Sequence, residues 1–230
     1  MLQYFYHTFD YLRDWRSLAV YANLFEDFAA AIYSKGCPLR HIALFVDGTD
    51  LGVSRPGMFQ SVLFSGHHWV HSLKYQGLTC PNGMQPFPFG PICGSNHDSF
   101  MLRHSQLVPV LHHLSRQLGR IFAAYGDLAY PSDPCLWRPT GGSTAWEREF
   151  DTTMSSMRIA NEWGFGKLFS LWAWLDYRHA HQVLLSPVGL IYPVANILTN
   201  CHTCLYGSQT GAYFGLMPPR LEDYLSGRAL

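Results

Sequence analysis

The sequence predicts an α/β protein in which helices flank a mixed β-sheet. Short apolar runs bounded by turn residues, such as residues 41–46 and 121–125, indicate buried strands. A longer stretch with apolar side chains at helical spacing, residues 145–177, indicates a helix after those strands. Because strands and helices alternate along a chain of 230 residues, we expect one large domain rather than two.

The N-terminal part of the chain, residues 1–37, is expected to be a helical segment. Apolar positions recur at roughly helical spacing over residues 8–34, with charged residues between them, and this pattern predicts a helix that packs on the main domain. The first strand, residues 41–46, is expected to end at Asp47, where Gly48 permits a turn.

A hairpin is expected next. Residues 71–79 and 84–92 indicate two strands, and Asn82-Gly83 between them is a strong signal for a hairpin turn. The remaining predicted elements are helices at 98–103 and 108–118, a strand at 121–125 that leads to Asp127, and a helix at 145–177 that Gly164 and Gly166 interrupt.

The composition supplies a large core but little positive charge. Hydrophobic residues make up 48% of the chain and aromatic residues 15%, whereas only 14% are charged and the formal net charge is zero. Lysine occurs only at Lys35, Lys74 and Lys167. Proteins that hold nucleic acid by their own surface usually carry a clear basic excess, so the composition argues against that mode of binding.

The sequence favours an intracellular protein. Six cysteines at irregular spacing fit reduced thiols better than a disulfide framework, and the chain does not open with a secretory signal pattern. The most apolar late segment, residues 183–198, is broken by Pro187 and Pro193 and is too short to span a bilayer. A nuclear location is compatible with these features, although no basic import cluster is visible.

Three acidic residues stand in distinctive local sequences. Asp47 lies in Phe-Val-Asp-Gly-Thr, Asp127 in Tyr-Gly-Asp-Leu-Ala-Tyr-Pro, and Glu162 in Ala-Asn-Glu-Trp-Gly-Phe-Gly. Two unit charges 4 Å apart repel by about 4 kcal/mol at an effective dielectric near 20, so a fold that gathers carboxylates usually offsets the repulsion with divalent cations. Two cations about 3.5–4 Å apart can hold the attacking and leaving oxygens of a phosphodiester.

These sequences resemble the DDE superfamily of transposases and endonucleases, specifically the PIF/Harbinger type and the nucleases derived from it. An interval of 35 residues separates Asp127 from Glu162, close to the short interval usual in the superfamily. The resembling stretches, in the order of the family, are Val46-Asp47-Gly48-Thr49-Asp50, Gly94-Ser95-Asn96-His97-Asp98-Ser99, Gly126-Asp127-Leu128-Ala129-Tyr130-Pro131, and residues 154–166 around Glu162.

The resemblance implies a ribonuclease-H-like fold over residues 38–225 and a metal-dependent DNA endonuclease. It implies that Asp47, Asp127 and Glu162 are the catalytic residues and the ligands of two Mg²⁺ or Mn²⁺ ions. It also implies DNA as substrate, a nuclear location, and a separate DNA-binding partner protein of the kind that Harbinger-type transposases use. No membrane partner is expected, and an oligomer is compatible with the sequence.

Each site residue also has a purely structural interpretation. Asp47 and Asp127 could be ordinary turn residues, and Glu162 could pair with Arg158 one helical turn earlier. Asp98 could cap the helix that follows it or support the metal site.

Other candidate binding residues also have structural alternatives. His67, His68, His71 and Lys74 share one segment and could meet a phosphate backbone or simply cover a strand. Cys201-His-Thr-Cys204 supplies two of the four ligands of a structural zinc, but no second pair follows, so buried structural cysteines are favoured.

The chain departs from the family in ways that leave other functions open. Phe169 stands where the family usually has a basic residue, and the DNA-binding region that usually comes first in the family is not seen. These departures suit an enzyme that depends on a partner for DNA binding, or a domesticated, non-catalytic interaction protein. A hydrolase of small phosphoesters is a third alternative.

Overall fold

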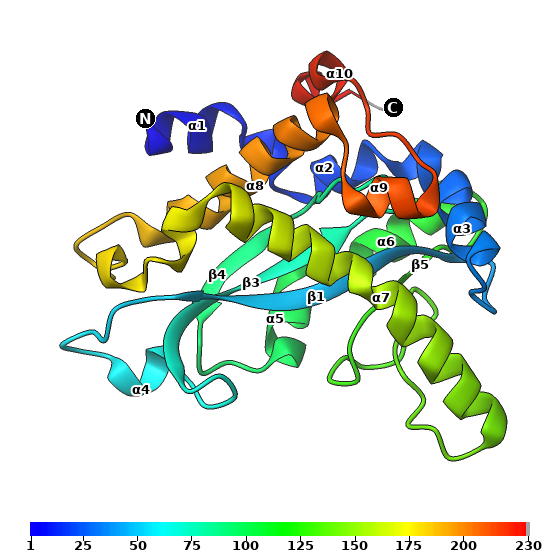
Figure 1. The fold of residues 1–230 in the computed structure, drawn as a ribbon, viewed down its shortest axis with the longest axis horizontal. Coiled ribbons are helices and arrows are strands. Elements are labelled where there is room, and N and C mark those ends of the chain that lie inside the picture. The colour runs from blue at the N-terminus through cyan, green and yellow to red at the C-terminus, as the bar shows by residue number, and fades with distance from the viewer. Residues whose placement is uncertain (229–230) are drawn as a thin grey trace.

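The computed structural model describes residues 1–228 and is built around a mixed β-sheet. Its six strands follow the order β2-β3-β1-β5-β6, and β4 pairs with β3 off this path (Figure 1). The strands are β1 (Ile42–Gly52), β2 (Phe64–Ser65), β3 (Val70–Thr79), β4 (Phe89–Cys93), β5 (Ala123–Tyr125) and β6 (Leu136–Trp137). Strands β2, β3 and β4 pair antiparallel, as β1 does with β3, whereas β5 is parallel to both β1 and β6. The predicted α/β class with a mixed sheet, consistent with a ribonuclease-H-like fold, is therefore confirmed.

Helices cover both faces of this sheet. They are α1 (Leu2–Thr8), α2 (Trp15–Ala19), α3 (Phe25–Ser34), α4 (Gln60–Leu63), α5 (Asp98–Ser105), α6 (Leu107–Gln117), α7 (Ala145–Leu171), α8 (Val188–Tyr206), α9 (Gln209–Phe214) and α10 (Leu221–Ser226). Short 3₁₀ turns stand at Asp10–Leu12, Ala22–Leu24, Ala173–Asp176 and Arg178–Ala180. Among residues 1–228, no helix combines the length and the hydrophobicity that crossing a membrane would require.

The core has one hydrophobic layer on each face of the central strand. Phe45 packs with Met154 and the rest of the buried side of α7, whereas its neighbour Val46 packs with Leu111 and the buried side of α6. This division follows from the alternation of side chains along a strand, which sends successive residues to opposite faces. Helix α7 crosses the sheet on the near side in Figure 1.

Strand β1 is longer than the sequence predicts. We expected it to end at Asp47, but it continues to Gly52 because β3 pairs with it along its whole second half, from Phe45 opposite Thr79 to Gly52 opposite Ser72. Asp47 therefore lies within a strand and not at a turn. The partner strand, which is distant in sequence, decides where β1 ends.

The predicted hairpin is confirmed in its turn, and its second strand is confirmed only from Phe89 onward, where β4 pairs antiparallel with β3. The Gly83 amide donates to the Cys80 carbonyl (2.8 Å), and the Cys80 amide donates to the Met84 carbonyl (2.9 Å), which closes the expected turn. Pairing resumes only at Phe89, where β4 begins. Prolines at positions 86 and 88 have no N–H to donate to a ladder, which explains the delay.

The N-terminal segment forms three separate helices instead of one. Asp14 ends the continuous helical pattern because its side chain accepts a hydrogen bond from the Arg16 amide and starts α2 afresh. Leu18 from α2 and Phe25 from α3 are buried in the same cluster as Val46, so this segment packs on the sheet.

Helix α7 runs without the predicted interruption at Gly164 and Gly166. It begins with a capping box, in which Thr144 and Glu147 satisfy one another's backbone amides, and it continues to Leu171. Each glycine costs about 1 kcal/mol of helix propensity, which the packing of a 27-residue helix on a sheet easily offsets.

Two glycines allow a direct test of the packing between α7 and β3. A Cβ atom on Gly77 would lie 2.7 Å from Cε1 of Phe165, whereas a Cβ on Gly166 would meet nothing within 4 Å. We expect Gly77→Ala to lower the free energy of unfolding by about 1–3 kcal/mol through overpacking. Gly166→Ala should raise it by about 0.5–1 kcal/mol through helix propensity. Urea unfolding measures both, and equal effects of the two variants would contradict the placement of Phe165 over β3.

Candidate functional site

Asp47 lies on β1 beneath α7. It is opposite Gly77 of β3, where the ring of Phe165 from α7 occupies the space that a Cβ atom would take. Its Oδ1 accepts a hydrogen bond from the Gly48 amide (2.9 Å), and its Oδ2 accepts one from Nη1 of Arg158 (3.1 Å). One backbone amide and one arginine of α7 therefore hold this side chain.

Asp127 occupies the equivalent position beyond the neighbouring strand. Strands β1 and β5 are parallel with Phe45 beside Tyr125, and each aspartate comes two residues later. Parallel strands deliver such positions to the same edge of the sheet. Nη1 of Arg158 lies 4.0 Å from Oδ1 of Asp127, so one guanidinium stands between the two carboxylates.

Burial controls the acidity of Asp47. The pKa of its carboxyl is raised to about 6, chiefly by desolvation; Arg158 and the Gly48 amide lower it, and the charges of Asp127 and Asp98 raise it. A carboxylate with this balance holds its negative charge at a cost in free energy. A further cation beside it would lower the cost.

Asp98 approaches the same region from the other face of the sheet. It is the first residue of α5, and His97 is the N-cap, so Asp98 does not cap its helix. Its Oδ1 is 3.3 Å from Nζ of Lys74 and would lie 3.4 Å from a Cβ on Gly48. Of the two alternatives that the sequence left open, the structure favours a place beside the acidic site.

Glu162 lies on α7 one turn after Arg158, with an exposed side chain. Within residues 1–228, no hydrogen bond or ion pair joins Glu162 to Arg158, Asp47 or Asp127. The surface pair between Arg158 and Glu162 that the sequence offered is absent there, because Arg158 turns toward Asp47. The structure thus brings Asp47 and Asp127 to one guanidinium, whereas Glu162 lines a pocket with Gln85 and Lys167 and contacts neither aspartate.

The basic segment before and along β3 is partly engaged by carboxylates. His68 pairs with Asp50, which also accepts a hydrogen bond from Ser72. Lys74 donates to the Asn96 carbonyl (3.0 Å) as well as meeting Asp98. These contacts favour the structural interpretation for His68 and Lys74.

The cysteine pair of α8 belongs to the core. Cys204 Sγ lies 3.9 Å from Sδ of Met84, and burial raises the pKa of the Cys204 thiol to about 12. His181, a possible further ligand, is committed to the Gly52 carbonyl through its Nδ1 (2.8 Å). Cys201 and Cys204 are half-buried and pack against the core, so the expectation of fully buried cysteines is not met.

Sequence reasoning missed a cluster formed by His112, Asp133 and Cys135. One ligand atom from each residue lies within 4.8 Å of the others. The only local signal is the close spacing of Asp133 and Cys135, because His112 comes from a helix 21 residues earlier.

The acidic site fits divalent metal ions. Asp47 and Asp127, on either side of Arg158, offer carboxylate oxygens, which are the ligands that Mg²⁺ and Mn²⁺ prefer. Burial raises the pKa of Asp47 even with Arg158 in contact, so a further cation beside the carboxyl would favour its charged form. The donor set and the electrostatics therefore suit hard cations.

A mixed sheet whose neighbouring parallel strands lead to paired aspartates, with a long helix across them, defines the ribonuclease-H-like class of α/β proteins. A family model described as DDE superfamily endonuclease matches residues 46–200, which is more than half of the chain. The chain belongs to this family. No curated protein and no solved structure matches it.

Proposed function

We propose that this protein is a metal-dependent DNA endonuclease of the DDE transposase type, related to the PIF/Harbinger group. One observation carries the proposal. Asp47 and Asp127 occupy equivalent positions on adjacent parallel strands and flank one guanidinium, inside the region that matches the DDE family.

The proposed ligands of two Mg²⁺ or Mn²⁺ ions are Asp47, Asp127 and Glu162. When bound, such ions activate a water molecule or a DNA 3′-hydroxyl and stabilise the leaving oxygen. Glu162 has an exposed side chain without a fixed partner among the described residues, so it is free to turn toward the aspartates. Arg158 holds Asp47 in place and neutralises part of the acidic charge.

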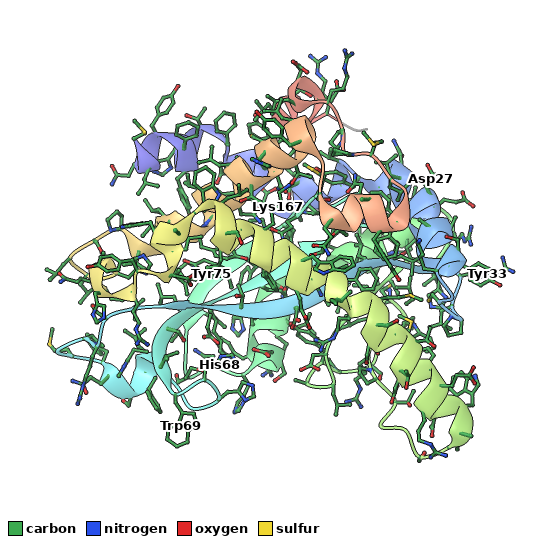
Figure 2. The ribbon with its side chains drawn as sticks, viewed as in Figure 1. Asp27, Tyr33, His68, Trp69, Tyr75 and Lys167 are labelled. Carbon is green, nitrogen blue, oxygen red and sulfur yellow. The ribbon has the colours of Figure 1, made fainter. Side chains whose placement is uncertain are left out.

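DNA binding is proposed to depend on a separate DNA-binding protein. The formal net charge of zero gives the chain little electrostatic attraction for a polyanion, and Lys167, which points from α7 toward α8, is occupied by Thr203 and the Gly207 carbonyl (Figure 2). A partner protein that supplies a basic surface would explain how a chain with so little positive charge binds DNA. We propose that the activity is nuclear, since DNA is the proposed substrate. Oligomerisation would be a second way to enlarge the DNA-binding surface.

The experiment is cleavage of supercoiled plasmid with Mg²⁺ or Mn²⁺ at low salt. We expect Glu162→Gln to reduce metal-dependent nicking by at least about 100-fold, because the amide keeps the shape but loses the negative charge that binds the ion. Glu149→Gln is the matched control, since Glu149 is also exposed on α7 and should leave nicking unchanged. Equal nicking by wild type and Glu162→Gln would remove Glu162 from the proposed site.

A second candidate function is a non-catalytic interaction protein that keeps the fold. The supporting observation is an apolar groove between residues 54–63 and 182–185, where Met58, Phe59 and Leu185 are exposed. Metal binding separates the two candidates. If the protein is a nuclease, Mg²⁺ or Mn²⁺ should bind the wild type and bind Asp47→Asn much more weakly. If the protein is a non-catalytic interaction protein, neither ion should bind the wild type.

A further inference from the structure

A second group of potential metal ligands lies on the α6 side of the sheet. His112 comes from α6, and Asp133 and Cys135 come from the segment that leads into β6. One ligand atom from each lies within 4.8 Å of the others, and no other group of three within residues 1–228 meets this condition. Asp47, Asp127 and Glu162 contribute no atom to this cluster.

The contacts of His112 link the three side chains. Its Nε2 lies 2.8 Å from Oδ1 of Asp133, and its Nδ1 lies 3.5 Å from Sγ of Cys135. Oδ1 of Asp133 also accepts a hydrogen bond from the backbone amide of Cys135 (2.8 Å). The loop therefore fixes the carboxylate and the thiol relative to one another, and the imidazole reaches both.

The cluster combines a buried thiol with two accessible ligands. Cys135 is fully buried. The side chains of His112 and Asp133 are 42% and 28% exposed, which gives an ion a path from solvent. Ser115 is the other polar side chain in contact with the thiol, at 3.8 Å.

We propose that His112, Asp133 and Cys135 bind one transition-metal ion of the zinc class, with water in the remaining position. Thiolate and imidazole ligands select such ions over Mg²⁺ and Ca²⁺, which prefer oxygen alone. Zinc bonds of about 2.0–2.3 Å place neighbouring ligand atoms about 3.3–3.6 Å apart, and the three ligand atoms, which lie within 4.8 Å of one another, can close to this spacing when the imidazole reorients. One nitrogen of His112 takes the ion, and the half-exposed ring has room to turn toward it. The thiol of Cys135 gives its proton to solvent when the ion binds.

The site would have a structural role near the acidic centre. Strand β6 pairs in parallel with β5, and the segment containing Asp133 and Cys135 connects Asp127 to β6. An ion bound to His112 would fasten this segment to α6. It would thereby restrict the chain on the C-terminal side of Asp127.

Cobalt binding to the reduced, full-length protein tests the proposal. Co²⁺ replaces Zn²⁺ in such sites, and a thiolate ligand gives a charge-transfer band in the near ultraviolet. We expect wild type to show this band with about one Co²⁺ per chain, to lose it when Zn²⁺ is added, and to retain it when Mg²⁺ is in excess. Cys135→Ser should abolish the band, and His112→Asn should weaken Co²⁺ affinity by at least about 100-fold.

Three control variants make the result specific. His113→Asn alters the adjacent, exposed histidine of α6 and should bind Co²⁺ like wild type. The pair Cys201→Ala and Cys204→Ala in one chain should also keep the band. Asp127→Asn should keep it too, which separates this site from the proposed nuclease site. The proposal is overturned if wild type shows no thiolate band, if the band survives Cys135→Ser and His112→Asn, or if it disappears with the α8 cysteines.

Discussion

Asp127→Ala is expected to lower metal-dependent nicking of plasmid DNA by at least about 100-fold while the protein stays folded. The carboxylate lies just beyond β5 and shares Arg158 with Asp47, so its loss removes one of the two best-placed metal ligands. Its side chain is 45% exposed, and removing it leaves no cavity in the core. The free energy of unfolding should therefore change by less than about 1 kcal/mol.

A matched control for Asp127→Ala is Asp27→Ala. Asp27 is an exposed aspartate on α3 (Figure 2), and its replacement changes the net charge by the same amount. If Asp27→Ala nicks DNA normally and Asp127→Ala does not, the loss of nicking is due to the position of Asp127 and not to the change in net charge. If Asp127→Ala nicks DNA at the wild-type rate, the proposed assignment of Asp127 is wrong.

The elements that the sequence predicts well are those whose signal is local. The strand around residues 121–125 and the helices α5 and α6 appear close to their expected places, because apolar runs and helical spacing are read within one segment. The extension of β1 to Gly52 depends on pairing with β3. The continuity of α7 depends on its packing against the sheet, which outweighs the low helix propensity of Gly164 and Gly166.

In the acidic site, too, the sequence predicts the features that have a local signal and misses those that depend on tertiary contacts. Family-like local sequences pointed to Asp47 and Asp127, and the parallel register of β1 and β5 brings the two close together. The bond from Arg158 to Asp47 spans 111 residues and has no counterpart in the local pattern, which instead suggested a pair with Glu162. The cluster of His112 and Cys135 joins residues of a helix and a loop whose contact only the tertiary fold creates. The catalytic role of Glu162 stays a prediction.

Asp47→Asn is expected to stabilise the metal-free protein at neutral pH. The pKa of the Asp47 carboxyl is raised from an ordinary value of 3.8 to about 6 in the folded state. Between these values the folded state binds the proton more tightly than the unfolded state, so wild-type stability falls as pH rises from 4 to 7. The asparagine side chain does not titrate. The advantage of the variant should therefore grow by about 2–3 kcal/mol over that interval, since one pKa unit corresponds to about 1.4 kcal/mol.

Urea unfolding at pH 4, 5.5 and 7.5 in the presence of a chelator measures this difference. Asp27→Asn, at an exposed position, should show no comparable trend. Added Mg²⁺ should then reverse the order at pH 7.5, because an ion that binds only the folded state stabilises wild type and not the variant. A constant difference at all three pH values would show that Asp47 is solvated in the folded protein. A pH trend without any effect of Mg²⁺ would show that the buried charge is compensated by Arg158 alone and that the acidic pair does not bind this ion.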